Sequence, residues 1–188
     1  MNDATWWDRA LRLSDDDVVG HVRHDEAGHA VYLHSLEADL LDRLEAYVAD
    51  GWQHGQRTVM FLERSRAAAL RARLEPRGLS HAVEAHDAAA ALESFLRGGM
   101  PQAPLFTALV NEVLAQQGHG SVRLYGEMVA LLWRDGAFTA ALELERLWNG
   151  YLAAHPMPLL CAYPAQDLED HPHLGRVCRA HGHVFPAA

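Results

Sequence analysis

Polar residues that could bind or transform a small molecule stand where apolar runs of this sequence end. Glu127 comes directly after Gly126 at the end of one such run, and His34 and Tyr163 stand at the ends of two others. A carboxylate near histidines gives an otherwise apolar cleft a polar anchor, which suits a small, partly polar organic molecule. We therefore expect one crevice to be lined by Glu127, His34, Tyr163 and His181.

Glu127 also has a simpler interpretation. A carboxylate directly before a helix could serve only to stabilise the first turn of that helix, because negative charge is favourable at a helix N-terminus. The sequence leaves both roles open for this residue.

The two cysteines, Cys161 and Cys178, suggest further chemistry. Cys161 lies within the apolar run 158–164, so we expect a buried, structural thiol there rather than a reactive one. Cys178 is followed closely by His181 and His183, and cysteine and histidine are residue types that suit zinc. No CxxC pair is present, so further ligands would have to come from distant positions, Cys161 among them. Whether these residues bind a metal stays open.

Several well-known catalytic and nucleotide-binding motifs are missing from the sequence. The first turn from strand to helix reads Leu33-His34-Ser35-Leu36-Glu37, without the glycines and lysine of a phosphate-binding GxxxxGK[ST] loop. No GxGxxG follows a predicted strand, and no GxSxG nucleophile elbow occurs. We therefore expect neither ATP binding nor ATP hydrolysis, and no cofactor. Ser35 is better explained as the N-cap of a helix than as a nucleophile.

Alternating strand-like and helix-like segments must position these residues. Short runs rich in apolar, β-branched and aromatic residues predict strands at 29–34, 57–62, 82–85, 121–125 and 158–164. Amphipathic segments between them predict helices, one capped by Ser35 and ending before Gly51, another capped by Asp87. Strands joined through helices run parallel, with helices on both faces. The expected fold is therefore a three-layer α/β fold whose ligands lie beyond the carboxyl ends of the strands.

Length and composition limit the classes of function. The 188 residues are 49% hydrophobic and 22% charged, which is typical of a globular chain, and we expect residues 1–23 to extend from one domain at 24–188. The formal net charge is 16 − 25 = −9, which argues against nucleic acid as a partner. No segment is apolar for long enough to span a bilayer, and the acidic start is unlike a signal peptide. With only two cysteines, a cytoplasmic protein is expected.

Six segments of the sequence together carry a resemblance to a known family. They are Gly28-His29-Ala30-Val31-Tyr32, Ala49-Asp50-Gly51-Trp52, Val122-Arg123-Leu124-Tyr125-Gly126-Glu127-Met128, Leu142-Glu143-Leu144-Glu145-Arg146-Leu147-Trp148-Asn149, Leu160-Cys161-Ala162-Tyr163-Pro164 and Val177-Cys178-Arg179-Ala180-His181. In this order they resemble the MEDS domain, the methanogen/methylotroph, DcmR-type sensory domain, over roughly residues 24–186. The segments around Glu127 and Cys161 are the most specific.

The resemblance implies a RecA-like α/β core that has lost its phosphate-binding motifs. It also implies a role in sensing small hydrocarbon derivatives for bacterial signalling, with a protein partner. The positions that it implies as site residues are Glu127, Cys161, Tyr163 and His181.

Three functions follow from these observations. The leading hypothesis is a cytoplasmic sensory or regulatory module that binds a small organic ligand and signals to a partner protein. A homo-oligomer is compatible with this hypothesis. The second is a hydrolase, either metal-dependent or of the Cys/His type, with Glu127 as base and Cys161 or the C-terminal Cys/His group supplying the rest. The third is a structural interaction protein descended from an ATPase.

Overall fold

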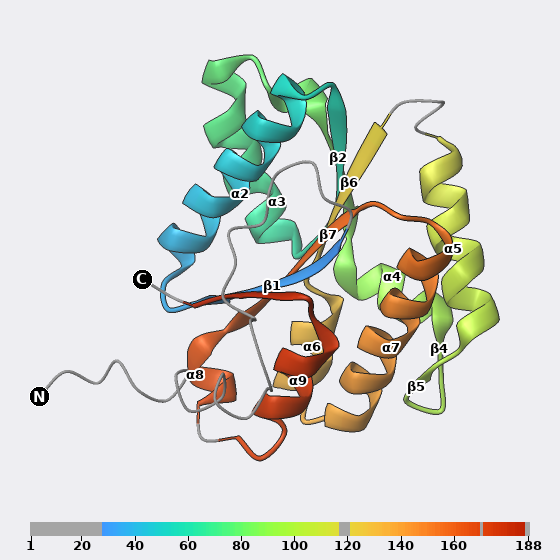
Figure 1. The fold of residues 1–188 in the computed structure, drawn as a ribbon. Helices are drawn as coiled ribbons and strands as arrows, with labels where there is room; N and C mark the ends of the chain where they lie inside the picture. The colour runs from blue at the N-terminus through green and yellow to red at the C-terminus, as the bar shows by residue number, and fades with distance from the viewer. Residues whose placement is uncertain (1–27, 117–120, 170, 187–188) are drawn as a thin grey trace, which may run out of the picture.

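The computed structural model describes residues 28–116, 121–169 and 171–186, and at its centre lies a six-stranded sheet whose strands all run parallel (Figure 1). The strand order is β3-β2-β6-β7-β1-β8. The strands span Gly28–His34 (β1), Gln56–Leu62 (β2), Val83–Asp87 (β3), Ser121–Gly126 (β6), Pro158–Pro164 (β7) and His183–Phe185 (β8). All five predicted strands are present within two residues of their expected bounds. The predicted extension at 1–23 lies outside the described residues.

Two helices cover one face of the sheet. They are α2 (Glu37–Gln53) and α3 (Arg64–Leu74), and α3 is followed by single 3-10 turns at Glu75–Arg77 and Ser80–Ala82. Leucines of both helices pack on sheet residues such as Tyr32, Met60 and Leu160, which are all buried. Burial of this surface, at roughly 25 cal/mol per Å² of apolar area, holds the layer in place.

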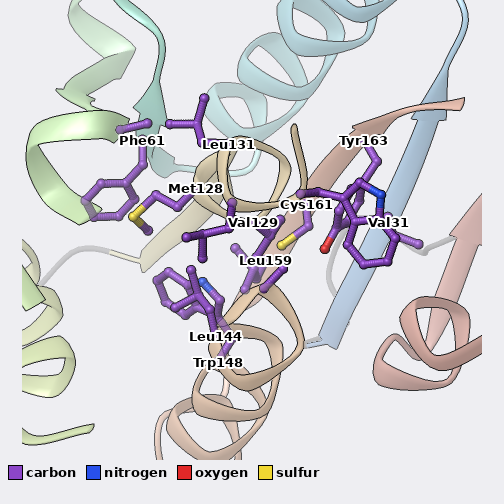
Figure 2. Close-up of a cluster of buried hydrophobic side chains, with 14 of the residues drawn as sticks. Val31, Phe61, Met128, Val129, Leu131, Leu144, Trp148, Leu159, Cys161 and Tyr163 are labelled. Atoms are coloured by element: carbon purple, nitrogen blue, oxygen red, sulfur yellow. The ribbon is translucent and has the colours of Figure 1, made fainter. Parts of the chain in front are cut away.

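The opposite face lies beneath a second group of helices (Figure 1). These are α4 (Ala88–Phe95), α5 (Ala103–Ala115), α6 (Met128–Arg134), α7 (Phe138–Ala154), α8 (Ala165–Leu168) and α9 (Leu174–Ala180). Figure 2 shows the core here, where Leu144 and Trp148 of α7 lie near Val129 and Leu159. Helices on both faces confirm the predicted three-layer α/β fold. Within the described residues, every helix is too short or too polar to cross a membrane.

A small hairpin stands outside the main sheet, between α4 and α5. Its strands are β4 (Leu96–Arg97) and β5 (Met100–Pro101), and they pair antiparallel. Gly98 and Gly99 form the turn with φ of +59° and +76°, a left-handed conformation that side chains disfavour. The hairpin thus connects two consecutive helices, α4 and α5, that have no strand of the main sheet between them.

The start of α4 was predicted correctly, whereas the start of α2 was not. Asp87 caps α4, its carboxylate accepting hydrogen bonds from the N–H groups of Ala89 and Ala90. Ser35 does not cap α2, because the helix begins one residue later than expected and its N-cap position is Leu36. The acidic first turn of α2 supplies the favourable charge there instead.

The predicted end of α2 was also wrong, because the helix continues through Gly51 to Gln53. Arg123 of β6 explains why a glycine is needed inside this helix. Its side chain is 1% exposed, donates hydrogen bonds to Gln56, Asp50 and the Tyr47 carbonyl, and lies against Gly51. A Cβ atom at Gly51 would stand 2.8 Å from the Arg123 Nε atom. The glycine therefore provides the space for a buried guanidinium.

This contact yields a test with a matched control. We expect Gly51→Ala to lower the free energy of unfolding by about 1–3 kcal/mol, because the added methyl group displaces Arg123 from its acceptors. Gly150→Ala, in α7, places its methyl group where no atom lies within 4 Å, so it should instead raise the free energy by about 0.4–1 kcal/mol. Urea denaturation of both variants measures the difference. Equal effects of the two changes would show that the contact is unimportant.

Candidate functional site

The carboxyl ends of β1, β2 and β6 enclose a small crevice, which we call the strand-end crevice. Its cavity has a volume of about 50 Å³. Its polar lining includes His34 at the end of β1, Glu63 after β2 and Glu127 after β6, with Arg66 of α3 beside them. This is where ligands of parallel α/β folds bind.

Glu127 is a buried carboxylate anchored to the neighbouring strand end. Its Oε2 atom accepts a hydrogen bond from the backbone N–H of Glu63 at 3.0 Å and lies 2.5 Å from Nη1 of Arg66. The Tyr125 hydroxyl donates to Oε1 at 3.0 Å. Burial raises the pKa of Glu127, although Arg66 opposes the rise. Glu127 occupies the N-cap position of α6 but makes no side-chain hydrogen bond to that helix, so its contacts to Glu63, Arg66 and Tyr125 go beyond a capping role.

Arg66 connects the layers that meet at the crevice. Besides Glu127 after β6, it donates from Nε and Nη2 to the two carboxylate oxygens of Glu37, at 2.7 Å each. Arg134 of α6 in turn pairs with Glu63 at 3.0 Å. Bidentate arginine–carboxylate pairs are among the stronger polar contacts in proteins. Helices α2, α3 and α6 are thus linked through charges that surround the crevice.

His34 contributes to the crevice a buried ring nitrogen that is available for a hydrogen bond. The residue is 7% exposed, and its Nδ1 atom has no hydrogen-bond partner within the described residues. Burial lowers the pKa of His34, and the charge of Arg66 lowers it further. A neutral imidazole nitrogen of this kind can donate or accept one hydrogen bond.

A second group of polar side chains lies on the other face of the sheet, beneath α7. This buried cluster consists of His29, Glu145, Cys161 and His181, and their potential ligand atoms all lie within 4.8 Å of one another. They come from β1, α7, β7 and the residue after α9, respectively. Figure 2 shows Cys161 and its neighbour Tyr163 among the apolar residues of this face.

Glu145 stands at the centre of the buried cluster. Its Oε2 atom lies 3.3 Å from Nε2 of His29 and 3.4 Å from Nε2 of His181. The Tyr163 hydroxyl donates to Oε1 at 2.7 Å. Burial alone would raise the pKa of Glu145, but the two histidines and the Tyr163 hydroxyl outweigh it and lower the pKa. The carboxylate is therefore held in its charged form inside the core.

The other members of the cluster respond to the same burial. It raises the pKa of the Cys161 thiol well above the usual range, and the charge of Glu145 adds to the rise. Burial, together with the nearby His181, lowers the pKa of His29 to about 4. The expectation that Cys161 is buried is confirmed, since its side chain is inaccessible to solvent.

The structure divides the predicted site residues between the two groups. His34 and Glu127 line the strand-end crevice, whereas Tyr163, His181 and Cys161 surround Glu145 on the opposite face. The predicted single crevice is therefore wrong. The reason is strand register: Tyr163 pairs with Leu33 and shares its face, while the next pair is His34 with Pro164. Successive side chains of a strand point to opposite faces.

The structure brings together only some of the cysteines and histidines that the sequence suggested as metal ligands. Of these residues, His181 and the more distant Cys161 belong to the buried cluster, whereas Cys178 and His183 do not. Sequence reasoning missed Glu145, His29 and Arg66. The sequence did carry a signal for Glu145: at helical spacing it falls on the stripe of Ala141, Leu144 and Trp148, where a carboxylate in the core needs a partner.

Comparison with known proteins found one family. The family model described as MEDS, the methanogen/methylotroph, DcmR sensory domain, matches residues 28–182, which is most of the chain. No curated protein and no solved structure matches. The matched range begins at β1 and includes every residue of the strand-end crevice and of the buried cluster named above.

The charges at the crevice give a second test. Arg66→Ala should lower the free energy of unfolding by about 3 kcal/mol at pH 7, because it leaves the buried Glu127 carboxylate without its cation. The loss should shrink as the pH falls. Without Arg66, the pKa of Glu127 rises further, so the carboxyl group becomes protonated in the folded variant and no longer needs a cation. Arg64→Ala is the control: Arg64 is exposed and pairs with Asp87 at the surface, so its removal should lower the free energy of unfolding much less than removal of Arg66 does. Urea denaturation between pH 5 and 8 measures both, and equal losses would contradict the assignment.

Proposed function

We propose that this chain, which belongs to the MEDS family of sensory domains, binds a small organic ligand in the strand-end crevice and passes that event to a partner protein. The family supports a sensory or regulatory role in general. The crevice supports the particular site, since it lies at the carboxyl ends of the strands and contains both charged and apolar groups.

The observation that carries the proposal is the buried Nδ1 atom of His34, which makes no hydrogen bond to any residue that the structure describes. A buried polar atom without a hydrogen bond costs free energy, and a ligand that supplies the bond removes that cost. Leu40, Leu131 and Ala162 also line the cavity, so an apolar part of the ligand has surface to contact. The ligand thus combines one hydrogen-bonding group with a short hydrocarbon part.

The size of the cavity limits the ligand further. A volume of about 50 Å³ has room for about three to five non-hydrogen atoms. This agrees with a small hydrocarbon derivative such as a short alcohol, aldehyde or amide. At a ceiling of about 1.5 kcal/mol per atom, four such atoms can give about 6 kcal/mol, which corresponds to a Kd of tens of micromolar at best.

Signal transmission would use the charges around the ligand. Arg66 contacts both Glu37 of α2 and Glu127 before α6, so a ligand beside it changes the balance between these pairs. Such a ligand shifts the positions of the helices only by its differential affinity for the two arrangements. The partner protein would read this change at the surface of α2, α3 or α6.

The structure gives less support to a hydrolase. Both oxygens of Glu127 already accept hydrogen bonds, which makes the carboxylate a poor general base. The Cys161 thiol is buried and its pKa is raised, the opposite of an activated nucleophile. We also propose a cytoplasmic location, supported by the two free and buried cysteines.

Thermal denaturation with small compounds tests the proposal. We would add one- to four-carbon alcohols, aldehydes, amides, amines and carboxylates at 10 mM, the concentration that weak ligands of this size require. A compound with a Kd of 0.1 mM should stabilise the protein by about 2.7 kcal/mol and raise the Tm by about 5–10 °C.

Two histidine variants make the result specific to the crevice. His34→Leu removes the unpartnered nitrogen while keeping the apolar contacts, so it should abolish the shift caused by any active compound. His54→Leu, an exposed residue at the far end of α2, should leave the shift unchanged. The proposal fails if no compound class stabilises the wild-type protein, or if the active compound stabilises the His34 variant equally.

A further inference from the structure

We propose that the buried cluster is a zinc site, in which His29 Nε2, His181 Nε2, Glu145 Oε2 and Cys161 Sγ are the four ligands. Histidine, carboxylate and thiolate are the ligand types that zinc takes in proteins. This site is separate from the strand-end crevice, and its test does not depend on the proposed ligand-binding function.

The hydrogen bonds around the two histidines direct lone pairs into the cluster. His181 Nδ1 lies 2.7 Å from the carbonyl oxygen of Val177, which can only accept, so this nitrogen carries the proton. In the neutral form of His181, Nε2 therefore presents a lone pair to the centre. That Nε2 atom is buried and makes no hydrogen bond to any residue that the structure describes.

His29 is oriented in the same way by Asn149. The Asn149 amide nitrogen donates to the carbonyl of Ala180 at 2.8 Å, which identifies its Oδ1 atom as the acceptor that faces His29. His29 Nδ1, 3.1 Å from that oxygen, is then the donor, and Nε2 is left with a lone pair. Both rings thus turn deprotonated nitrogens toward Glu145.

When both rings are neutral, fewer protons are present than the acceptors that meet in the cluster require. His29 Nε2 lies 3.2 Å from Cys161 Sγ and can accept the single thiol proton. His181 Nε2 then faces Glu145 Oε2 at 3.4 Å with a lone pair on each atom. In a group buried from solvent, two facing acceptors repel unless a cation or a further proton lies between them. A bound cation satisfies all four ligand atoms together.

The distances fit the size of zinc. With Zn–N and Zn–O bonds of about 2.0–2.2 Å and a Zn–S bond of about 2.3 Å, tetrahedral ligands lie about 3.3–3.6 Å apart. The separations of Glu145 Oε2 from His29 and His181 are 3.3 and 3.4 Å, and that of His29 from Cys161 is 3.2 Å. The Cys161–Glu145 separation is 3.9 Å and all ligand atoms lie within 4.8 Å of one another, so side-chain movements of up to about 1 Å complete the tetrahedron.

Outer partners support each of three ligands, as is usual around protein-bound metals. Tyr163 holds the free oxygen of Glu145, Asn149 holds His29, and the Val177 carbonyl holds His181. Four protein ligands leave no open coordination position, which is the pattern of a structural rather than a catalytic zinc. On binding, Cys161 loses its proton to solvent and coordinates as the thiolate. The ion would then fasten α7 and the end of α9 to strands β1 and β7.

Metal analysis of the purified full-length chain is the first test. We expect about one zinc per chain by mass spectrometry, and removal with a strong chelator should lower the Tm by about 5–10 °C in a manner reversed by added zinc. Cobalt(II) added to the chelated protein should give the visible bands of a tetrahedral site and a near-ultraviolet thiolate-to-cobalt band. Less than one-tenth equivalent of zinc combined with no cobalt spectrum would overturn the proposal, and would identify a proton-sharing histidine–carboxylate network instead.

Variants assign the ligands. Cys161→Ser should abolish the near-ultraviolet band and weaken zinc binding, measured against a chromophoric chelator, by more than about 100-fold. Cys178→Ser is the matched control: its thiol is also buried but lies outside the cluster, so the spectrum and the affinity should not change. An unchanged cobalt spectrum in the Cys161 variant, or an equal loss in both variants, would contradict the assignment.

A milder variant covers the case in which the Cys161 variant does not fold. Asn149→Ala leaves all four ligands in place and removes only the partner of His29, so it should weaken zinc binding by about 10–100-fold while keeping the tetrahedral cobalt spectrum. Zinc affinity equal to that of the wild type would contradict the role of Asn149 as the outer partner of a zinc-bound His29.

Discussion

Helices cover the side chains on both faces of the middle of this sheet, so a polar group there costs free energy unless it finds a partner inside the protein. This constraint follows from the parallel strands and the helices on both faces. On one face, β1 and β7 direct His29, Cys161 and Tyr163 toward α7, where all three contact the carboxylate of Glu145. The position of α7 therefore depends on polar contacts as well as on the apolar core around Trp148.

The two polar groups of the molecule differ in how they meet this requirement. At the strand ends, Arg66 pairs both with the buried Glu127 and with the exposed Glu37, and the second of these pairs can open to solvent at small cost. The buried cluster has no such freedom, because its atoms are enclosed and hydrogen bonds hold both histidine rings in one orientation. The first group is suited to responding to a ligand, and the second to holding one arrangement of the chain.

Strands β1, β2, β6 and β7 were predictable from the sequence because each contains a short apolar run that helices cover on both sides, whereas β3 is a more polar strand at the edge of the sheet. Periodicity alone was less informative where contacts between distant residues decide the outcome. Nothing near Gly51 in the sequence reveals that Arg123 packs against it and lets α2 continue. The division of His34 from Tyr163 depends on the register between β1 and β7, which only the assembled sheet defines. Glu145 was recognisable as a carboxylate on an apolar stripe, but its partners lie on three other elements.

The strand order has a consequence for how the chain is made. Strand β1 is the first of the described strands to be synthesised, yet its neighbours in the sheet are β7 and β8, the last two. During translation the apolar segment from Ala30 to Leu33 therefore waits for almost the whole domain to emerge before it can be paired. Contacts of such long sequence separation form slowly, and an unpaired apolar strand is a surface for aggregation or for chaperones. The pairing of β1 is thus one of the last steps in the folding of this domain, because it requires that β7 and β8 have both been synthesised.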